Sequence, residues 1–260
     1  MIMDKVSAIF PTLDRTDCDL NDMDRIYNRI ARRQPAYISL MFPVIWIYIF
    51  VAETNKLGDN ASVVKYIFNC IVAICVFLPA LLFLYEQLIR GISEIVTESL
   101  LFKLINPVLV PFRHNCISLN KKDKEKIAEI ANSHYKIEID EIKGADKLRC
   151  NKELRNKLKV LVKFIRFSDP VKNSSIAFEN NCVYGFFRNL VGGVVLDLLI
   201  YYGISLIGNP NTSNLMQSFY DISIPLLWSL FFVSLIFAWC YRVKQVKRDC
   251  NIIINTSVIF

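Results

Sequence analysis

The chain has 260 residues, of which 53% are hydrophobic and 21% are charged, and its formal net charge at pH 7 is +7. A soluble domain is about 45–50% apolar and about 25% charged, so this composition argues against an ordinary soluble protein. We expect no cleavable signal peptide, because residues 1–20 contain acidic side chains and no apolar core segment.

The N-terminal region, residues 1–35, is predicted to be a cytoplasmic amphipathic segment. Potential N-caps at residues 16–19 precede four apolar residues at helical spacing, which are Met23, Ile26, Tyr27 and Ile30. The arginines that flank this apolar stripe are Arg25, Arg29, Arg32 and Arg33. Pro35 is expected to end the helix. The pattern predicts either a short helix on the inner membrane face or a helix that packs on the central domain.

Four apolar segments have the length of a membrane-spanning helix, which is about 20 residues. These segments are residues 36–52, 66–85, 190–207 and 222–241, and their only charged residue is Asp197. Buried helices of soluble proteins usually keep a polar stripe, whereas these segments are hydrophobic on all sides. We therefore predict an all-α membrane protein, with transmembrane helices 1 and 2 within residues 36–88 and transmembrane helices 3 and 4 within residues 189–241.

Residues 89–188, between the two pairs of spans, are predicted to form a mostly helical cytoplasmic domain. Asn120 fits as the N-cap of a helix over residues 121–135, whose inward face is formed by Ile127, Ile130 and Ala131. Residues 136–142 alternate briefly in polarity and are expected to form one strand. A second amphipathic helix is predicted to end at residues 168–170, and its apolar residues are Leu148, Leu154, Leu158, Leu161, Val162 and Ile165.

Basic residues predict the orientation of the spans, because they collect on the cytoplasmic side of short connections. Basic residues precede the first span, for example Arg33, and follow the fourth, for example Arg242. Others, such as Arg90 and Arg188, lie between the second and third spans. Residues 208–221 contain no Lys or Arg. We therefore expect a multi-pass membrane protein with both termini in the cytoplasm. Residues 242–260 are predicted to form a basic cytoplasmic tail. The net positive charge is explained by this orientation and by attraction to anionic lipid, rather than by binding of nucleic acid.

The residues that usually mark catalysis or metal binding are sparse. The chain has two histidines, His114 and His134, which are too few for a structural zinc site with four ligands. Its eight cysteines all fall within predicted spans or on the cytoplasmic side, so no disulfide framework is expected. There is no Gly-rich phosphate loop, nucleophile elbow or Cys-x-x-Cys pair. We therefore expect no metal, no cofactor and no enzymatic activity.

Asp197 departs most clearly from the apolar pattern. It lies nine residues beyond Arg188, which is about 13 Å along a helix that rises about 1.5 Å per residue. A central acid costs about 2.5–3.5 kcal/mol on insertion scales, so Asp197 must face another helix, line water or be protonated. Gly193 allows a second helix to approach closely, and the hydroxyl of Tyr201 is a candidate donor. Further candidate partners in or beside the second span are Asn69 and Lys65.

We single out Asp197, Arg188 and Tyr201 as candidate functional residues. For Asp197, a polar contact that joins helices and a role in a pore or switch are equally open. Arg188 follows three aromatic residues at the predicted inner interface, Tyr184, Phe186 and Phe187. This combination is typical of an interfacial aromatic belt and by itself predicts only an anchor.

The sequence NNCVYGFFRNL, at residues 180–190, leads directly into the third predicted span. It resembles a motif of small bacterial membrane proteins that place a cytoplasmic helical segment between pairs of spans. The overall plan is similar to that of membrane effectors of bacterial anti-phage systems, including those paired with retron reverse transcriptases. The resemblance implies an effector of abortive infection, which stays silent until a partner senses the phage and then damages the inner membrane.

The leading hypothesis is therefore a non-enzymatic inner-membrane effector that acts by oligomerisation or by rearrangement of its spans. Its expected partners are the lipid bilayer, further copies of the same chain, and a sensor complex such as a reverse transcriptase with its RNA. No direct binding of nucleic acid is expected. The alternatives are a small transporter or channel subunit, and a membrane anchor that recruits a soluble partner through the central domain.

Overall fold

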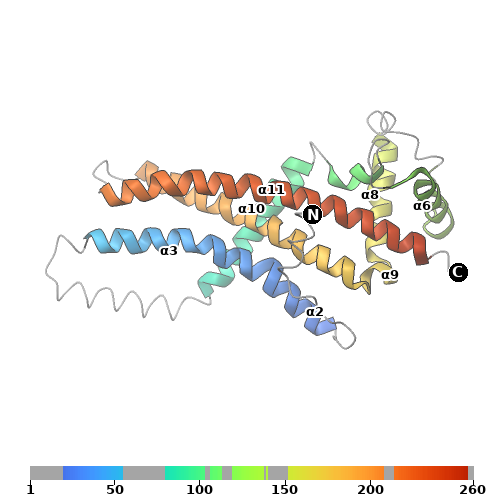
Figure 1. The fold of residues 1–260 in the computed structure, drawn as a ribbon, viewed down its shortest axis with the longest axis horizontal. Helices are drawn as coiled ribbons and strands as arrows, with labels where there is room; N and C mark the ends of the chain where they lie inside the picture. Colours follow the sequence, from blue (N-terminus) through green and yellow to red (C-terminus); the bar gives the residue numbers. More distant parts are fainter. Residues whose placement is uncertain are drawn as a thin grey trace. The chain divides into compact units, whose positions relative to one another are not determined.

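The computed structural model describes residues 20–54, 80–102, 106–112, 119–137, 139, 152–207 and 214–256. Every regular element within these ranges is helical, so the predicted all-α class is confirmed. In chain order (Figure 1), the elements are α2 (Leu20–Tyr27), η1 (Asn28–Arg33), α3 (Gln34–Thr54), η3 (Glu94–Leu101), η4 (Pro107–Phe112), α6 (Lys121–His134), α8 (Lys152–Phe167), α9 (Asp169–Lys172), α10 (Ser175–Ile207) and α11 (Asn214–Thr256). Residues 80–93 are also helical and lead directly into η3.

The contacts divide the chain into two compact units. We call the first the span unit, which consists of Asn21–Leu100 and Gly185–Ile236. We call the second the head unit, which consists of Met1–Leu20, Leu101–Tyr184 and Phe237–Phe260. The long helices α10 and α11 each contribute residues to both units.

The head unit has a hydrophobic core formed by α6, α8 and the C-terminal part of α11. Asn120 caps α6 as predicted: its side chain accepts from the Asp123 N–H at 2.8 Å, and the Asp123 carboxylate accepts from the Asn120 N–H at 3.3 Å. This reciprocal pair satisfies two of the N–H groups that a helix start leaves free. The buried core includes the predicted inward residues Ile127, Ile130, Ala131, Leu158, Leu161, Val162 and Ile165, together with Val246, Cys250, Ile253 and Ile254 of α11.

The predicted strand at residues 136–142 is wrong for the residues that the structure describes there. Lys136 has a positive φ of 52°, and the N–H of Ile137 bonds back to a carbonyl oxygen inside α6 at 3.0 Å, so this stretch closes the helix. The N–H of Ile139 donates to Asn132 Oδ1 at 2.9 Å. Ile137 and Ile139 alternate because both pack on the head core, while the backbone finds its partners in α6 instead of a neighbouring strand.

The N-terminal helix differs from the prediction at Pro35. α2, η1 and α3 follow one another without a break, so Pro35 lies inside a continuous helical path and does not end it. Proline has no N–H and leaves the carbonyl four residues earlier, that of Ala31, without its α-helical donor. The winding is π-helical over η1, and the side chain of Asn189 on α10 donates to the Ala31 carbonyl at 2.6 Å. A tertiary hydrogen bond therefore replaces the missing helical one.

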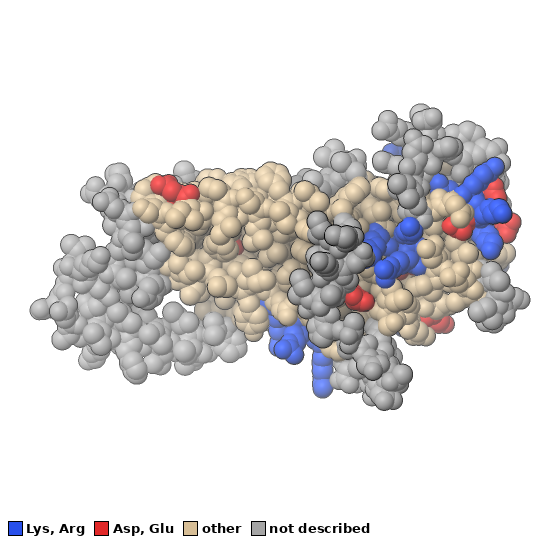
Figure 2. Space-filling model, viewed as in Figure 1, with Lys and Arg blue, Asp and Glu red and all other residues tan. Residues whose placement is uncertain are grey.

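Two helices in the described part of the chain are long and apolar enough to cross a bilayer, Ser175–Gly203 within α10 and Gln217–Thr256 within α11. The full helices α10 and α11 contain the third and fourth predicted spans. Large apolar side chains on α11 are exposed, with Ile222 at 70% and Ile236 at 61%, and Figure 2 shows a broad uncharged surface on this face of the molecule. Extensive exposed apolar surface marks contact with a membrane or a partner, so the fold supports membrane association.

The first predicted span corresponds to α3, which is 21 residues long. Most of the second predicted span lies outside the described residues, as do Lys65, Asn69, Leu148 and His114. Two spans are thus supported by the structure, and the full set of four remains a prediction from the sequence.

Candidate functional site

Asp197 lies on α10 in the span unit, and its side chain is fully buried, at 0% exposure. Ser39 Oγ, on α3, donates to Asp197 Oδ2 at 2.6 Å, and Tyr85 OH, on the helix over residues 80–93, donates to Asp197 Oδ1 at 2.6 Å. Ser39 Oγ and Tyr85 OH are themselves 2.8 Å apart. These three side chains, which we call the carboxyl triangle, connect three helices that are distant in the sequence.

The carboxyl triangle is fully hydrogen-bonded only when Asp197 carries a proton. Three contacts among three groups need three hydrogens, and the hydroxyls of Ser39 and Tyr85 supply two. If Asp197 is ionised, both hydroxyl hydrogens point to the carboxylate, and the 2.8 Å contact between the hydroxyl oxygens has none. A protonated carboxyl supplies the third hydrogen and removes a buried charge, which an apolar surrounding disfavours. The triangle is therefore complete for the neutral acid and incomplete for the anion.

Two adjacent glycines of α10 allow the three helices to approach this closely. A Cβ at Gly193 would lie 2.7 Å from both Cβ and Oγ of Ser39. A Cβ at Gly192 would lie 2.3 Å from the backbone oxygen of Ile89 and 2.8 Å from the Cβ of Ser93. These distances are shorter than real Cβ contacts, so only glycine fits at either position. The close approach expected at Gly193 is therefore confirmed.

Tyr201 lies one turn beyond Asp197 and packs its ring against Trp46 of α3, with the ring centroids 5.5 Å apart. The tyrosine hydroxyl that donates to Asp197 is that of Tyr85. Trp46 belongs to an apolar cluster that includes Leu190, Val194, Leu198 and Leu227, with Tyr201 packed against it. The structure thus assigns Tyr201 to apolar packing beside the carboxyl triangle.

The carboxyl triangle lies close to charged residues at one end of the span unit. Glu86 follows Tyr85 directly, and Arg33 lies six residues before Ser39, which is about 9 Å along a helix at about 1.5 Å per residue. Arg33 Nε and Glu86 Oε1 are 3.9 Å apart. Measured from Arg33, the triangle lies about 9 Å from the predicted cytoplasmic edge, which is less than the distance of about 13 Å measured from Arg188.

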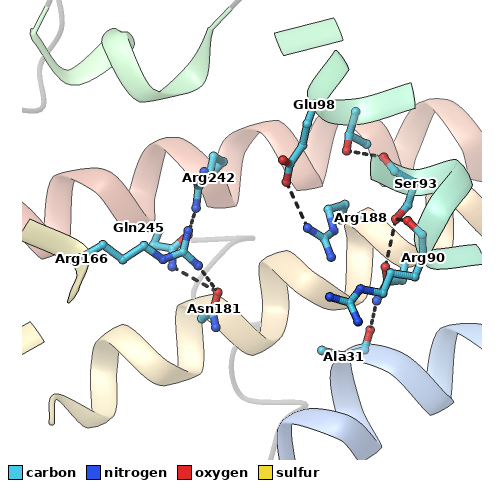
Figure 3. Close-up of polar contacts among 11 residues, drawn as sticks. Ala31, Arg90, Ser93, Glu98, Arg166, Asn181, Arg188, Arg242 and Gln245 are labelled. Carbon is cyan, nitrogen blue, oxygen red and sulfur yellow. Dashed lines mark hydrogen bonds and ion pairs between the residues drawn. The ribbon is translucent and has the colours of Figure 1, made fainter. Parts of the chain in front are cut away.

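Arg188, the second candidate residue, pairs with Glu98 of η3, with 3.0 Å between Nη1 and Oε1 (Figure 3). The side chain of Arg188 is 17% exposed and that of Glu98 is 42% exposed, so solvent partly screens the pair, and it stabilises the fold by about 1 kcal/mol or less. Arg188 therefore joins α10 to η3 in addition to its predicted place at the membrane interface.

Asn189 joins the same helices, although the sequence pattern does not mark it. Its Nδ2 donates to the Ala31 carbonyl, its Oδ1 accepts from Ser93 Oγ at 3.1 Å, and only 2% of the residue is exposed. Ala31 lies in η1, and Ser93 directly precedes η3. Figure 3 shows both partners beside α10. Both η1 and η3 are π-helical, and π-helical turns are rare and often mark functional sites. We therefore infer that the contacts of Asn189 with Ala31 and Ser93 are specific.

A second polar network lies in the head unit and connects α8, α10 and α11 (Figure 3). Arg166 Nη2 donates to Asn181 Oδ1 at 2.6 Å, Gln245 Nε2 donates to the same oxygen at 3.4 Å, and Arg242 Nη1 donates to Gln245 Oε1 at 2.9 Å. Burial raises the pKa of Asp249, beyond the apolar run of α11, to about 6, while Arg166 and Arg242 act to lower it.

No group of three or more His, Cys, Asp or Glu side chains that could hold a metal occurs among the residues that the structure describes. No protein-family model, curated protein or solved structure matches the chain.

Ser39, Tyr85 and Asn189 are the site residues that sequence reasoning missed. Ser39 and Tyr85 did carry a signal, because each is a polar group within about two turns of the inner end of an uncharged segment. Asn189 carried one as well, since it directly precedes the third predicted span. None of these signals identifies the partner, because the contacts to Asp197 and Ala31 link residues 112 to 158 positions apart.

Proposed function

We propose that the protein is a non-enzymatic, multi-pass inner-membrane effector of bacterial antiviral defence, which permeabilises the membrane when a partner triggers it. The observation that carries this proposal is the carboxyl triangle, in which Asp197 is buried between three helices and accepts hydrogen bonds from Ser39 and Tyr85. Ionisable residues inside membrane segments are costly and are usually functional.

The carboxyl triangle suits a two-state element. In the closed arrangement the acid is neutral and fully hydrogen-bonded. If the helices separate, Ser39 and Tyr85 leave, and the carboxyl must find water or ionise, because an unpaired acid in an apolar surrounding is unfavourable. The open arrangement therefore draws water between the spans. A stimulus that favours the open state shifts the population towards it.

The helix that carries Asp197 also reaches the head unit. Asn181, on the same helix α10, takes part in the network with Arg166 and Gln245, and α11 likewise continues from the span unit into the head core. A partner that alters the packing of the head unit therefore acts on the helices of the spans. This arrangement supports triggering by a sensor complex, and the resemblance at residues 180–190 supports the defence role.

Oligomerisation is part of the proposal because exposed apolar faces remain on the span unit. Large apolar side chains at 50% exposure or more lie on α3, on the helix over residues 80–93 and on α10 as well as on α11, for example Met41, Phe83 and Leu199. In a bilayer such faces contact lipid or another copy of the chain. An assembly of several copies provides the walls that a water path needs.

Induced expression of the full chain in bacterial cells tests the proposal. With its trigger, or at high expression, we expect loss of the membrane potential, read with a voltage-sensitive dye, followed by growth arrest. The decisive case is a chain that is abundant in the membrane, in cells that carry its natural neighbouring genes and are infected by phage. If neither loss of membrane potential nor growth arrest follows there, the proposal is contradicted.

A small transporter or channel subunit is the second candidate, and the buried carboxyl itself favours it, because intramembrane acids also serve as proton and ion relays. A transporter moves a solute or protons at steady expression without arresting growth. A membrane anchor that recruits a soluble partner through the head unit does neither. The depolarisation assay therefore distinguishes the three classes.

A further inference from the structure

The span unit contains a basic cavity beside α2, η1 and the start of α3. Its volume is about 560 Å³, within the range of about 300–1,000 Å³ that is usual for small-molecule sites. The described residues that line it are Arg25, Asn28, Arg29, Arg33, Gln34 and Tyr37. Three arginines, an asparagine, a glutamine and a tyrosine therefore line one space, at the predicted inner edge of the first span.

The basic residues that line the cavity lie on α2, η1 and the start of α3, on a different side of this helical path from the one that packs on α10. The packing side contacts α10, where a Cβ at Gly185 would lie 2.9 Å from the Ala31 Cβ and 3.0 Å from the Tyr27 hydroxyl. Arg25 and Arg29 are exposed. Arg33 approaches Glu86 only to 3.9 Å and remains 61% exposed. Three arginines and no acidic residue are found among the described residues that line the cavity, which predicts an anionic ligand.

The same face continues into an apolar stripe along α3. Tyr37 is 52% exposed, Met41 60% and Ile45 37%, and these residues follow Arg33 at intervals of four, which places them on one side of the helix. From Arg33 to Ile45 the helix rises about 18 Å at about 1.5 Å per residue. This length is close to one leaflet, or about half of the 30 Å hydrocarbon core. The stripe therefore passes from cations through an aromatic ring to apolar side chains.

We propose that this cavity binds the phosphate group of an anionic glycerophospholipid, whose acyl chains lie along the stripe of Tyr37, Met41 and Ile45. Guanidinium groups bind phosphate oxygens in pairs, and basic pockets at the cytoplasmic ends of spans suit lipid head groups. The apolar continuation favours a lipid over a free phosphate ester. The inference requires α3 to lie in the membrane and does not depend on the role in defence.

The test uses the full chain in a non-ionic detergent, with bound lipid counted by native mass spectrometry. Phosphatidylglycerol should bind more tightly than phosphatidylcholine with the same acyl chains. The double variant Arg25→Gln/Arg29→Gln should weaken phosphatidylglycerol binding at least about tenfold and weaken phosphatidylcholine binding less, because the choline cation already offsets its phosphate charge. Millimolar inorganic phosphate should not displace the lipid.

A matched control removes the same charge outside the cavity. Arg32 lies over the Tyr27 ring at 5.6 Å, and Arg90 is exposed on the helix over residues 80–93. The variant Arg32→Gln/Arg90→Gln should therefore weaken binding less than about threefold. Arg25→Lys/Arg29→Lys keeps the charge and should give an intermediate affinity, because lysine does not bind phosphate in a bidentate manner.

Three results would overturn the proposal. They are unchanged binding in Arg25→Gln/Arg29→Gln, an equal loss in the control variant, and displacement of the lipid by inorganic phosphate, which would indicate a site for soluble phosphate. If the double variant is not recovered from membranes, Arg29→Gln alone is measured, with a loss of about threefold expected. Lipid binding without depolarisation would contradict only the defence role, so the two proposals fail separately.

Discussion

Removal of the Tyr85 hydroxyl is predicted to loosen the carboxyl triangle. Tyr85→Phe deletes two contacts, at 2.6 Å to Asp197 and 2.8 Å to Ser39. Hydrogen bonds between membrane helices contribute about 0.6 kcal/mol each on average and at most about 1.7 kcal/mol. The closed arrangement should therefore lose about 1–3 kcal/mol, which favours the open state by a factor of roughly five or more. We expect depolarisation and toxicity without the trigger.

Asp197→Asn is predicted to act in the opposite direction. The amide donates through Nδ2 to one hydroxyl and accepts through Oδ1 from the other, and the remaining hydroxyl hydrogen joins Ser39 to Tyr85. All three contacts are kept, as they are for the protonated acid, but the group no longer ionises. We therefore expect a normally inserted and abundant protein that does not depolarise cells when triggered.

Both variants are compared by voltage-sensitive dye in induced bacterial cells, with membrane abundance measured on the same samples. Tyr202→Phe is the matched control, because Tyr202 lies on the same helix as Asp197 and is 46% exposed, and it should behave like the parent. A Tyr85→Phe protein as silent as the parent would refute the reasoning about the triangle. A fully active, normally abundant Asp197→Asn protein would reduce Asp197 to a packing residue.

Helix packing, acid–base balance and topology give three further predictions. Gly192→Ala should abolish recovery of a monodisperse protein on size exclusion, because its Cβ would lie 2.3 Å from the Ile89 carbonyl oxygen. Gly203→Ala is the control and should be recovered normally, because nothing lies within 4 Å of its Cβ. Equal recovery of the two variants would contradict this packing. Because burial raises the folded-state pKa of Asp249 from 3.8 to about 6, the folded state holds this proton more tightly, and stability should fall as the pH rises through that interval. Asp249→Asn should then raise the free energy of unfolding at pH 8 by up to about 3 kcal/mol, with no difference below pH 4, and equal thermal midpoints at pH 8 would refute the assignment. Cysteines placed at Asp59 and Thr212 should react with an impermeant reagent from outside intact cells, and those at Lys126 and Arg248 should not; external labelling at Lys126 would contradict four spans.

Local signals in the sequence predicted the helices of the head unit well. The cap at Asn120 and the 3.6-residue period of Ile127, Ile130 and Ala131 depend on neighbours within one helix, and both are found. The strand expected at residues 136–142 is not formed at the described residues 136, 137 and 139, because alternation reports only which side chains are buried. It does not report that Asn132 supplies the partner for the backbone.

The candidate site could be predicted only in part, because its contacts are tertiary. Asp197 stands out in the sequence since a lone acid in an apolar segment needs a partner. Its partners Ser39 and Tyr85 cannot be selected from the pattern, because uncharged spans have no polar face that reveals their rotation. The prediction that Pro35 ends the helix was wrong for the same reason. The Ala31 carbonyl, which loses its helical donor at Pro35, accepts instead from the side chain of Asn189, 158 residues away.

The most direct test of the central claim is the access of water to Val194, which lies beside the carboxyl triangle on α10 and is fully buried. A single cysteine is placed there in a chain whose eight native cysteines are replaced, and Leu199→Cys, at a position that is 59% exposed on the same helix, serves as the lipid-facing control. We predict that Val194→Cys resists a water-soluble thiol reagent at rest and reacts when the cells depolarise, while Leu199→Cys stays unreactive in both states. Depolarisation with Val194→Cys still protected would show that the water path does not pass the carboxyl triangle.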